Sequence, residues 1–141
     1  MVGSGNYAAV LTRPDIAYAM SVFSRFMQAP TKRHMKGMRQ VILYLHATKD
    51  DGIEYRRDSQ TELQGYYTYP KDGDFPKPEV YVDADWARCV DTRRSQTSYV
   101  ILYGGGAISH CSRRQLVTSR SSAEAEYIAA AECTAEITYL R

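Results

Sequence analysis

The chain has 141 residues, of which 44% are hydrophobic and 24% are charged; this balance fits one globular domain and argues against wholesale disorder. The formal net charge is only +2, so no strong overall field attracts nucleic acid, and local clusters of basic residues would have to do so. The three cysteines are widely spaced and form no CxxC pair, which argues against a disulfide framework or a zinc site.

Nothing in the sequence indicates a membrane or a secretory route. No apolar run approaches the roughly twenty residues of a membrane-spanning helix, and the N-terminus lacks the basic and apolar regions of a signal peptide. With its unpaired cysteines, the chain is expected to be intracellular, either cytoplasmic or nuclear. A signal removed from the sequence would leave secretion open.

The first 50 residues predict a helical hairpin. One helix is expected over residues 12–28, with Thr12 as its cap and Pro14 in its first turn, and a second from Thr31 to about Thr48. Apolar residues recur at helical spacing in both, at Ile16, Met20, Phe23 and Met27 and at Met35, Met38, Ile42 and Leu45. A hairpin this small needs another surface to pack on.

From residue 50 the period of the pattern changes to that of strands. Residues 52–56 alternate between apolar and polar positions, and residues 63–69 are a second candidate strand. Residues 70–78 contain three prolines and an Asp-Gly-Asp run, which predicts a loop or a wide hairpin turn.

The second half of the chain predicts a small antiparallel sheet and one packed helix. The helix is expected over residues 121–140, with Ser121 and Glu124 forming a capping box. Gly104–Gly106 predicts a tight turn between the last two strands. The strands are expected at 79–86, 96–103 and 106–113. The fold class is therefore α+β, with a helical hairpin ahead of the sheet.

Two acidic motifs stand out in this half. Asp83 and Asp85 follow an apolar strand, and Glu126 lies in the first turns of the last helix. An acid at a strand end and one near a helix start can converge on a divalent metal, as in a nuclease site. The two motifs together are therefore a candidate metal site. Asp85, two residues on from Asp83, would face the same side of a straight strand and is an auxiliary candidate.

Each acid also has a structural interpretation. Asp83 could accept hydrogen bonds from a neighbouring turn, and Asp85 could lie at the strand end and face solvent. Glu126 is placed by the helical period on an apolar face, where an unpaired charge is unfavourable, so a metal or an arginine partner is expected there. The other members of that face are Ala130, Cys133, Ile137 and Leu140.

Basic residues in the second half are the candidate nucleic-acid contacts. Arg and Lys side chains bind backbone phosphates and make salt-dependent contacts. The alternative is an ordinary solvated polar face, and each pair taken alone favours that alternative. The candidates are Arg93, Arg94, Arg113, Arg114 and Arg120. A further basic group occupies residues 32–39.

In chain order, these residues resemble the Pol polyprotein of copia-type LTR retrotransposons. The end of its reverse transcriptase is matched by Thr12–Ala19, Ser24–Met27 and Pro30–His34. The opening of its RNase H domain is matched by Val82–Ala87, Arg93–Tyr99, Gly105–Ser109, Ser112–Gln115 and Ser121–Tyr127. The resemblance covers nearly the whole chain without a change of order.

The resemblance implies a division of the chain and an ancestral activity. Residues 1–50 resemble the C-terminal tail of the reverse transcriptase. Residues 51–141 resemble a partial RNase H domain of three antiparallel strands and a helix, with an inserted loop, hairpin or extra strand around 67–80. Asp83 and Glu126 match metal ligands, and the remaining ligands of the family lie further along the domain. The implied reaction is hydrolysis of RNA in RNA–DNA hybrids with Mg²⁺ or Mn²⁺.

Two carboxylates fall short of the three or four that hold a pair of metal ions, so metal binding and cleavage by this chain are expected to be weak or absent. The truncated sheet would leave the first strand with a free apolar edge, which is an association hazard. The insertion, a second copy or another protein partner is expected to cover it; no membrane partner is expected. The alternative function is a repurposed interaction protein, an effector or regulator, that binds its partner through this scaffold.

Overall fold

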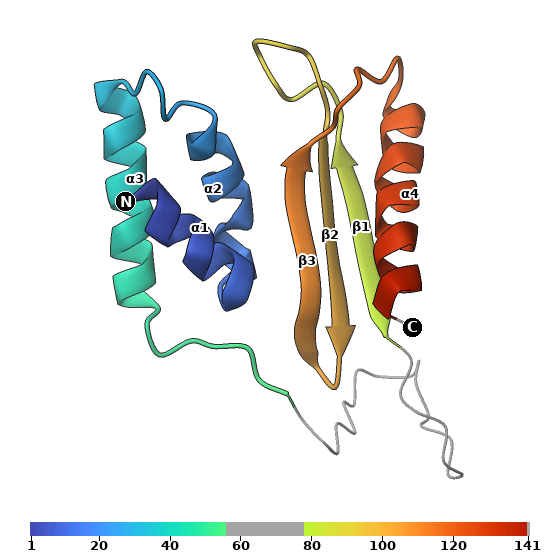
Figure 1. The fold of residues 1–141 in the computed structure, drawn as a ribbon, viewed down its shortest axis with the longest axis horizontal. Coiled ribbons are helices and arrows are strands. Elements are labelled where there is room, and N and C mark those ends of the chain that lie inside the picture. The colour runs from blue at the N-terminus through green and yellow to red at the C-terminus, as the bar shows by residue number, and fades with distance from the viewer. Residues whose placement is uncertain (56–77, 141) are drawn as a thin grey trace.

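The computed structural model describes residues 1–55 and 78–140 and has the predicted α+β class. A three-helix unit lies on one side of a three-stranded antiparallel sheet, and a long helix lies on the other (Figure 1). The elements are α1 (Val2–Leu11), the 3₁₀ turn η1 (Pro14–Ile16), α2 (Ala17–Ser24), α3 (Lys32–Ala47), β1 (Glu79–Asp85), β2 (Gln96–Tyr103), β3 (Gly106–Arg114) and α4 (Ser122–Leu140). We call α1–α3 with η1 the helical unit, and β1–β3 with α4 the sheet unit.

The start of the helical unit differs from the prediction. α1 occupies residues 2–11, where no helix was predicted, and residues 12–28, expected as one helix, form a turn, η1 and the shorter α2. The sequence of α1 contains glycine, serine and asparagine, which favour helices poorly. Packing forms it nevertheless: a Cβ on Gly5 would lie 2.7 Å from the Met20 side chain, so the glycine lets α1 approach α2 closely.

α3 begins as predicted, directly after its cap Thr31. The Thr31 hydroxyl accepts a hydrogen bond from the His34 amide at 3.3 Å, and the His34 ring accepts one from the Thr31 amide at 3.2 Å. This is a reciprocal capping box in which histidine stands where Glu or Gln is usual. The core of the unit consists of Ala9, Ile16, Met20 and Met38.

The three predicted strands of the second half are confirmed. They pair in the order β1-β2-β3, and a two-residue turn at Gly104 and Gly105, both with positive φ (58° and 80°), joins β2 to β3. Residues 52–55 have no regular secondary structure, so the strand predicted at 52–56 is wrong over those positions. The candidate strand at 63–69 and most of the insertion around 67–80 lie outside the described residues.

The two faces of the sheet are covered differently. α4 packs on one face, where Ala84 of β1 meets Ala125 and Ala129. The helical unit meets the other face largely through polar contacts. Arg25 donates to the Gln96 side chain at 2.7 Å, and the Gln96 amide donates to Ser21 at 3.1 Å. A hydrogen bond of 2.7 Å joins the His110 ring to the carbonyl of Ala9.

β1 forms one edge of the sheet. Among the residues that the structure describes, no strand pairs with its outer side. The expected cover of that edge by an inserted segment, a second copy or another protein therefore stays a prediction. Over the same described ranges, no helix is long and apolar enough to cross a membrane.

Candidate functional site

β1 places the two candidate aspartates on one face of the sheet, as predicted. In the register, Asp83 lies opposite Ser98 and Asp85 lies opposite Gln96, whose side chain contacts the helical unit. Asp83 is exposed and lines a cleft of about 510 Å³ between the start of α2 and the sheet, together with Asp15, Tyr18 and His110. Asp85 forms an ion pair with exposed Arg88 at 3.2 Å, so of the two aspartates it is the one with a cationic partner.

Glu126 does not lie where the helical period placed it. The residues of α4 that are buried against the sheet are Ala125, Ala129 and Cys133, so Glu126 lies one position beyond this row and is exposed. Cys133, which the sequence placed on the apolar face, is buried. Within residues 1–55 and 78–140, Glu126 has no hydrogen bond or ion pair, so the metal or arginine partner expected there stays a prediction.

The carboxylates do not fit a two-metal centre. Asp83 and Asp85 lie on the sheet face turned toward the helical unit, whereas α4, which carries Glu126, packs on the opposite face through Ala84. Within residues 1–55 and 78–140, no group of three or more His, Cys, Asp or Glu side chains could hold a metal ion. Two-metal hydrolysis needs three or four converging carboxylates, so we derive no hydrolytic step.

The five candidate arginines gather at one end of the sheet, as Figure 1 shows for the segments that carry them. Residues 86–95, between β1 and β2, and residues 113–121, from the end of β3 to the residue before α4, contain six arginines and one aspartate. We call this region the arginine end. Three of its arginines have partners. Arg88 pairs with Asp85, Arg113 pairs with Glu132 at 3.2 Å, and Arg114 donates to Cys89 and Thr92 at 3.5 Å. Arg93 and Arg120 are exposed, and Arg94 is half-buried.

Buried polar side chains fix the loops of the arginine end. The hydroxyl groups of Ser95 and Ser119 are 2.7 Å apart, and the Ser95 hydroxyl also accepts the amide of Ala87 at 3.1 Å. Beneath them, the Gln115 side chain donates to Thr97 at 3.1 Å and to the carbonyl of Ala125 at 2.9 Å. These bonds tie both loops and the start of α4 into one framework, so the arginines project from a defined surface.

Sequence reasoning missed this framework, although a signal existed. Ser95, Thr97 and Gln115 lie inside motifs that carry the resemblance to retrotransposon Pol, where polar residues interrupt a strand pattern. It also missed Cys89, a buried thiol in the β1–β2 loop. The Thr92 hydroxyl and then the Arg114 guanidinium stabilise the thiolate and lower the pKa of Cys89 to about 6.

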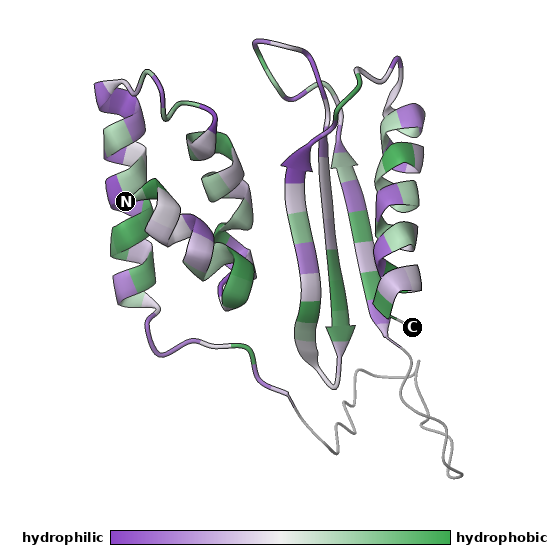
Figure 2. Ribbon diagram, in the orientation of Figure 1, coloured by the Kyte–Doolittle hydropathy of each residue, from purple (hydrophilic) through white to green (hydrophobic). Residues whose placement is uncertain are grey.

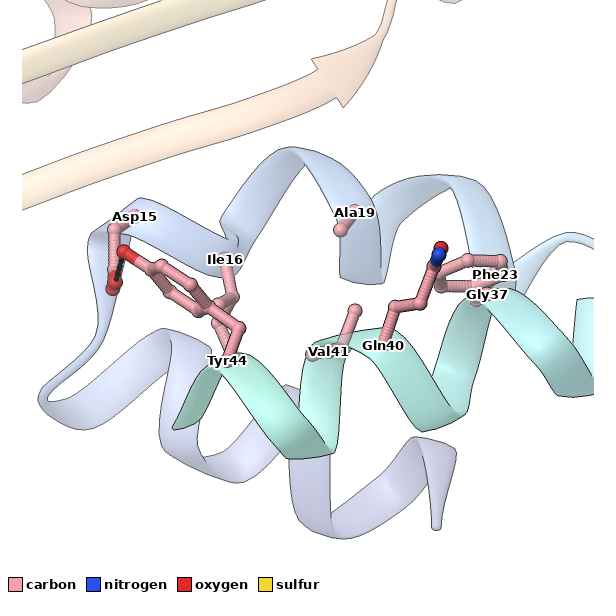
Figure 3. Close-up of a pocket in the computed structure, with 8 residues that line it drawn as sticks. All are labelled: Asp15, Ile16, Ala19, Phe23, Gly37, Gln40, Val41 and Tyr44. Atoms are coloured by element: carbon pink, nitrogen blue, oxygen red, sulfur yellow. Dashed lines mark hydrogen bonds between the residues drawn. The ribbon is translucent and has the colours of Figure 1, made fainter. Parts of the chain in front are cut away.

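A separate groove of about 410 Å³ runs between α2 and α3 (Figure 3). Its walls are largely apolar, with Ile16, Phe23 and Val41 among them, and the Tyr44 hydroxyl donates to Asp15 at 2.7 Å at one end. Arg13 binds the same carboxylate at 2.7 Å and the hydroxyl of Thr48 at 2.6 Å. The polar network closes the helical unit at the end of α3 and has a structural role.

Comparison with known proteins decides the family. The chain is 39% identical over 140 residues to the retrovirus-related Pol polyprotein from transposon TNT 1-94 of Nicotiana tabacum. It is 36% identical over 139 residues to secreted RxLR effector protein 161 of Plasmopara viticola, and the match covers 99% of this chain and 87% of that protein. The chain belongs to the copia-type retrotransposon Pol family.

The proteins that match this chain differ greatly in length. The matched region is 99% of this chain but only 9% of the tobacco polyprotein, and 8% of the Pol polyprotein from transposon RE1 of Arabidopsis thaliana, which is 34% identical. The chain thus spans a small part of the retrotransposon polyproteins and most of the length of the effector. No family model and no solved structure matches it.

Proposed function

We propose that this Pol-derived chain carries the first half of an RNase H-like domain, that it retains affinity for RNA–DNA hybrids, and that it cleaves them weakly or not at all. Three antiparallel strands followed by a helix packed on them, with Asp83 in the first strand and Glu126 in that helix, support the ancestry. The carrying observation is the arginine end, where basic side chains project from a hydrogen-bonded framework.

The charges of the arginine end suit a nucleic-acid backbone. Arginines bind phosphate through paired N–H donors, and Arg93, Arg94 and Arg120 have no carboxylate partner among the described residues. Arg113 and Arg114 are held by Glu132 and by the Cys89 loop, so they would position the surface. Any bound Mg²⁺ or Mn²⁺ would be weakly held, because the carboxylates do not converge.

Hybrid binding and cleavage test the proposal separately. A labelled RNA–DNA hybrid should bind, and the R93Q/R94Q/R120Q variant should reduce the salt dependence of that binding by about 2.7, or about 0.9 for each phosphate that the variant no longer neutralises. Incubation with Mg²⁺ or Mn²⁺ should give little cleavage. Robust cleavage that disappears in D83N or E126Q would contradict the inactive half of the proposal, and absence of hybrid binding would contradict the other half.

The second candidate is a repurposed, non-enzymatic interaction protein. The observation that favours it is the match to a protein of similar length that is named as a secreted effector. In that case the scaffold would bind a protein partner and have no measurable affinity for hybrids. Tight binding to a purified partner protein, without hybrid binding, would select this function over the first.

A further inference from the structure

The outward face of α3 carries a row of basic side chains that form no ion pair within the described residues. At 100° per residue, Lys32, Lys36 and Arg39 fall on one line, opposite the packed side around Met38 and Val41. Arg33 flanks the row, and all four basic residues are exposed. Figure 2 shows the resulting hydrophilic colour at the start of α3. The row is ~10 Å long, since each residue advances the helix by about 1.5 Å.

Local structure gives these cations no compensation. α3 contains no aspartate or glutamate, and none of the four basic residues forms an ion pair within the described residues. Like charges three and four residues apart repel one another, and cations near the start of a helix oppose its dipole. Even the capping box uses His34 where an acid is common. The arrangement works against helix stability, and an external anion bound along the row would offset this cost.

An apolar groove lies beside this row. It has a volume of about 420 Å³ and is lined by the first residues of α1, by Phe26, Met27 and Pro30, and by Met35 and Met38 of α3. Phe26 stacks on the His34 ring with the ring centroids 4.1 Å apart. A cationic track next to an aromatic, apolar groove is the arrangement by which proteins bind single-stranded nucleic acid, with phosphates on the cations and bases in the groove.

We propose that Lys32, Lys36 and Arg39, with the groove at Phe26 and Met35, form a binding site for single-stranded nucleic acid. The site is on the helical unit, separate from the arginine end, and it does not depend on hybrid binding. A lipid surface fits less well, because the groove is concave and the apolar residues lie beside the cations along a narrow strip. Each phosphate bound on a single strand contributes about 0.7 to the salt dependence of binding.

The test is fluorescence anisotropy of labelled oligothymidylate with the full chain, across a series of salt concentrations. Lys36→Glu should weaken binding several-fold and lower the slope of log affinity against log salt by about 0.7. Lys49→Glu is the matched control, because it changes the net charge equally at an exposed position just beyond α3, and it should bind as the native chain does. Phe26→Leu should weaken binding and leave the slope unchanged.

Stability provides the readout that separates weaker binding from unfolding. Lys36→Glu removes repulsion from α3, so its melting temperature should equal or exceed that of the native chain while its affinity falls. Equal affinity of Lys36→Glu and Lys49→Glu would overturn the proposal. The proposal would also be overturned if the native chain bound phosphatidylserine vesicles but not oligothymidylate, and if Lys36→Glu abolished the vesicle binding. If the R93Q/R94Q/R120Q variant lost hybrid binding but still bound oligothymidylate, the result would support a separate single-strand site on α3.

Discussion

The helical unit and the sheet unit are stabilised in different ways. The helical unit has an apolar core in which Met20 and Met38 pack between the three helices with Ala9 and Ile16. In the sheet unit, the small residues Ala84, Ala125 and Ala129 pack together between β1 and α4, and Ile101 of β2 is fully buried as well. Buried hydroxyl and amide groups hold the loops at the arginine end. Apolar packing tolerates change in shape, whereas a buried hydrogen-bond network fixes one arrangement. The surface with the more fixed geometry is therefore the arginine end, which the buried hydrogen-bond network supports.

The largest expected loss of stability comes from a substitution in the core of the helical unit. Met20 is almost fully buried, so Met20→Ala should lower the free energy of unfolding by about 2–5 kcal/mol through reduced burial and the cavity left behind. Met35→Ala, at an exposed position on the same unit, should change it by less than about 0.5 kcal/mol. Chemical denaturation followed by circular dichroism measures both. Equal effects of the two substitutions would contradict the assigned core.

The next prediction tests the framework of the sheet unit. Gln115→Ala removes the donor to Thr97 and to the carbonyl of Ala125 and should cost about 1–3 kcal/mol. Gln115→Met should cost less. It keeps the volume and also removes the side-chain oxygen of Gln115, which has no hydrogen-bond partner within the described residues. The control Leu116→Ala, at the exposed neighbour, should be nearly neutral. Calorimetry or denaturant unfolding gives the ranking, and a larger loss for methionine than for alanine would contradict it.

These two units also differ in how much of them the sequence predicts. The three strands of the sheet unit are predicted to within one residue at each end, because alternation and the paired glycines at 104 and 105 are local signals. The start of α3 is predicted by its cap. α1 was missed because its own sequence favours helix poorly and its stability comes from contacts with Met20, which is distant in the chain. Tertiary packing overrides local propensity there.

The candidate site shows a different limit. In α4, two rows of small or apolar residues fit the helical period, one through Ala125, Ala129 and Cys133 and one that includes Glu126. Because alanine occurs in both rows, the sequence does not indicate which row is buried against the sheet. Contact with Ala84 of β1 determines that it is the row of Ala125 and Ala129. The polar framework was missed because Ser95 and Ser119 are bonded across 24 positions of the chain, which no periodic pattern reveals.

The N-caps of α3 and α4 allow the same kind of substitution to be made in each unit. Thr31 caps α3, and Ser121 accepts the amide of Glu124 at 3.1 Å at the start of α4. Either residue replaced by alanine should cost about 1 kcal/mol. The Glu124 carboxylate accepts the amide of Arg120 at 2.6 Å, so Ser121→Ala should also loosen the arginine end. Amide hydrogen exchange should rise at Arg120 in Ser121→Ala and stay unchanged there in Thr31→Ala.

The smallest expected effect concerns acid stability of the helical unit. Hydrogen bonding to Arg13, followed by that to Tyr44, holds the pKa of Asp15 below its ordinary value of 3.8 despite partial burial. Because the folded pKa is the lower one, the ionised carboxyl stabilises the fold above that ordinary value, and this contribution is lost as the pH falls through the folded pKa. For a partly exposed pair the contribution is about 1 kcal/mol or less. Asp15→Asn should therefore be less stable than the native chain near neutrality, and the gap should close on acidification. Asp50→Asn removes the same charge at an exposed position beyond α3, outside this network, and is the matched control. A gap for Asp15→Asn that widens in acid would contradict the network of Arg13, Asp15 and Tyr44 as the join between η1 and the end of α3.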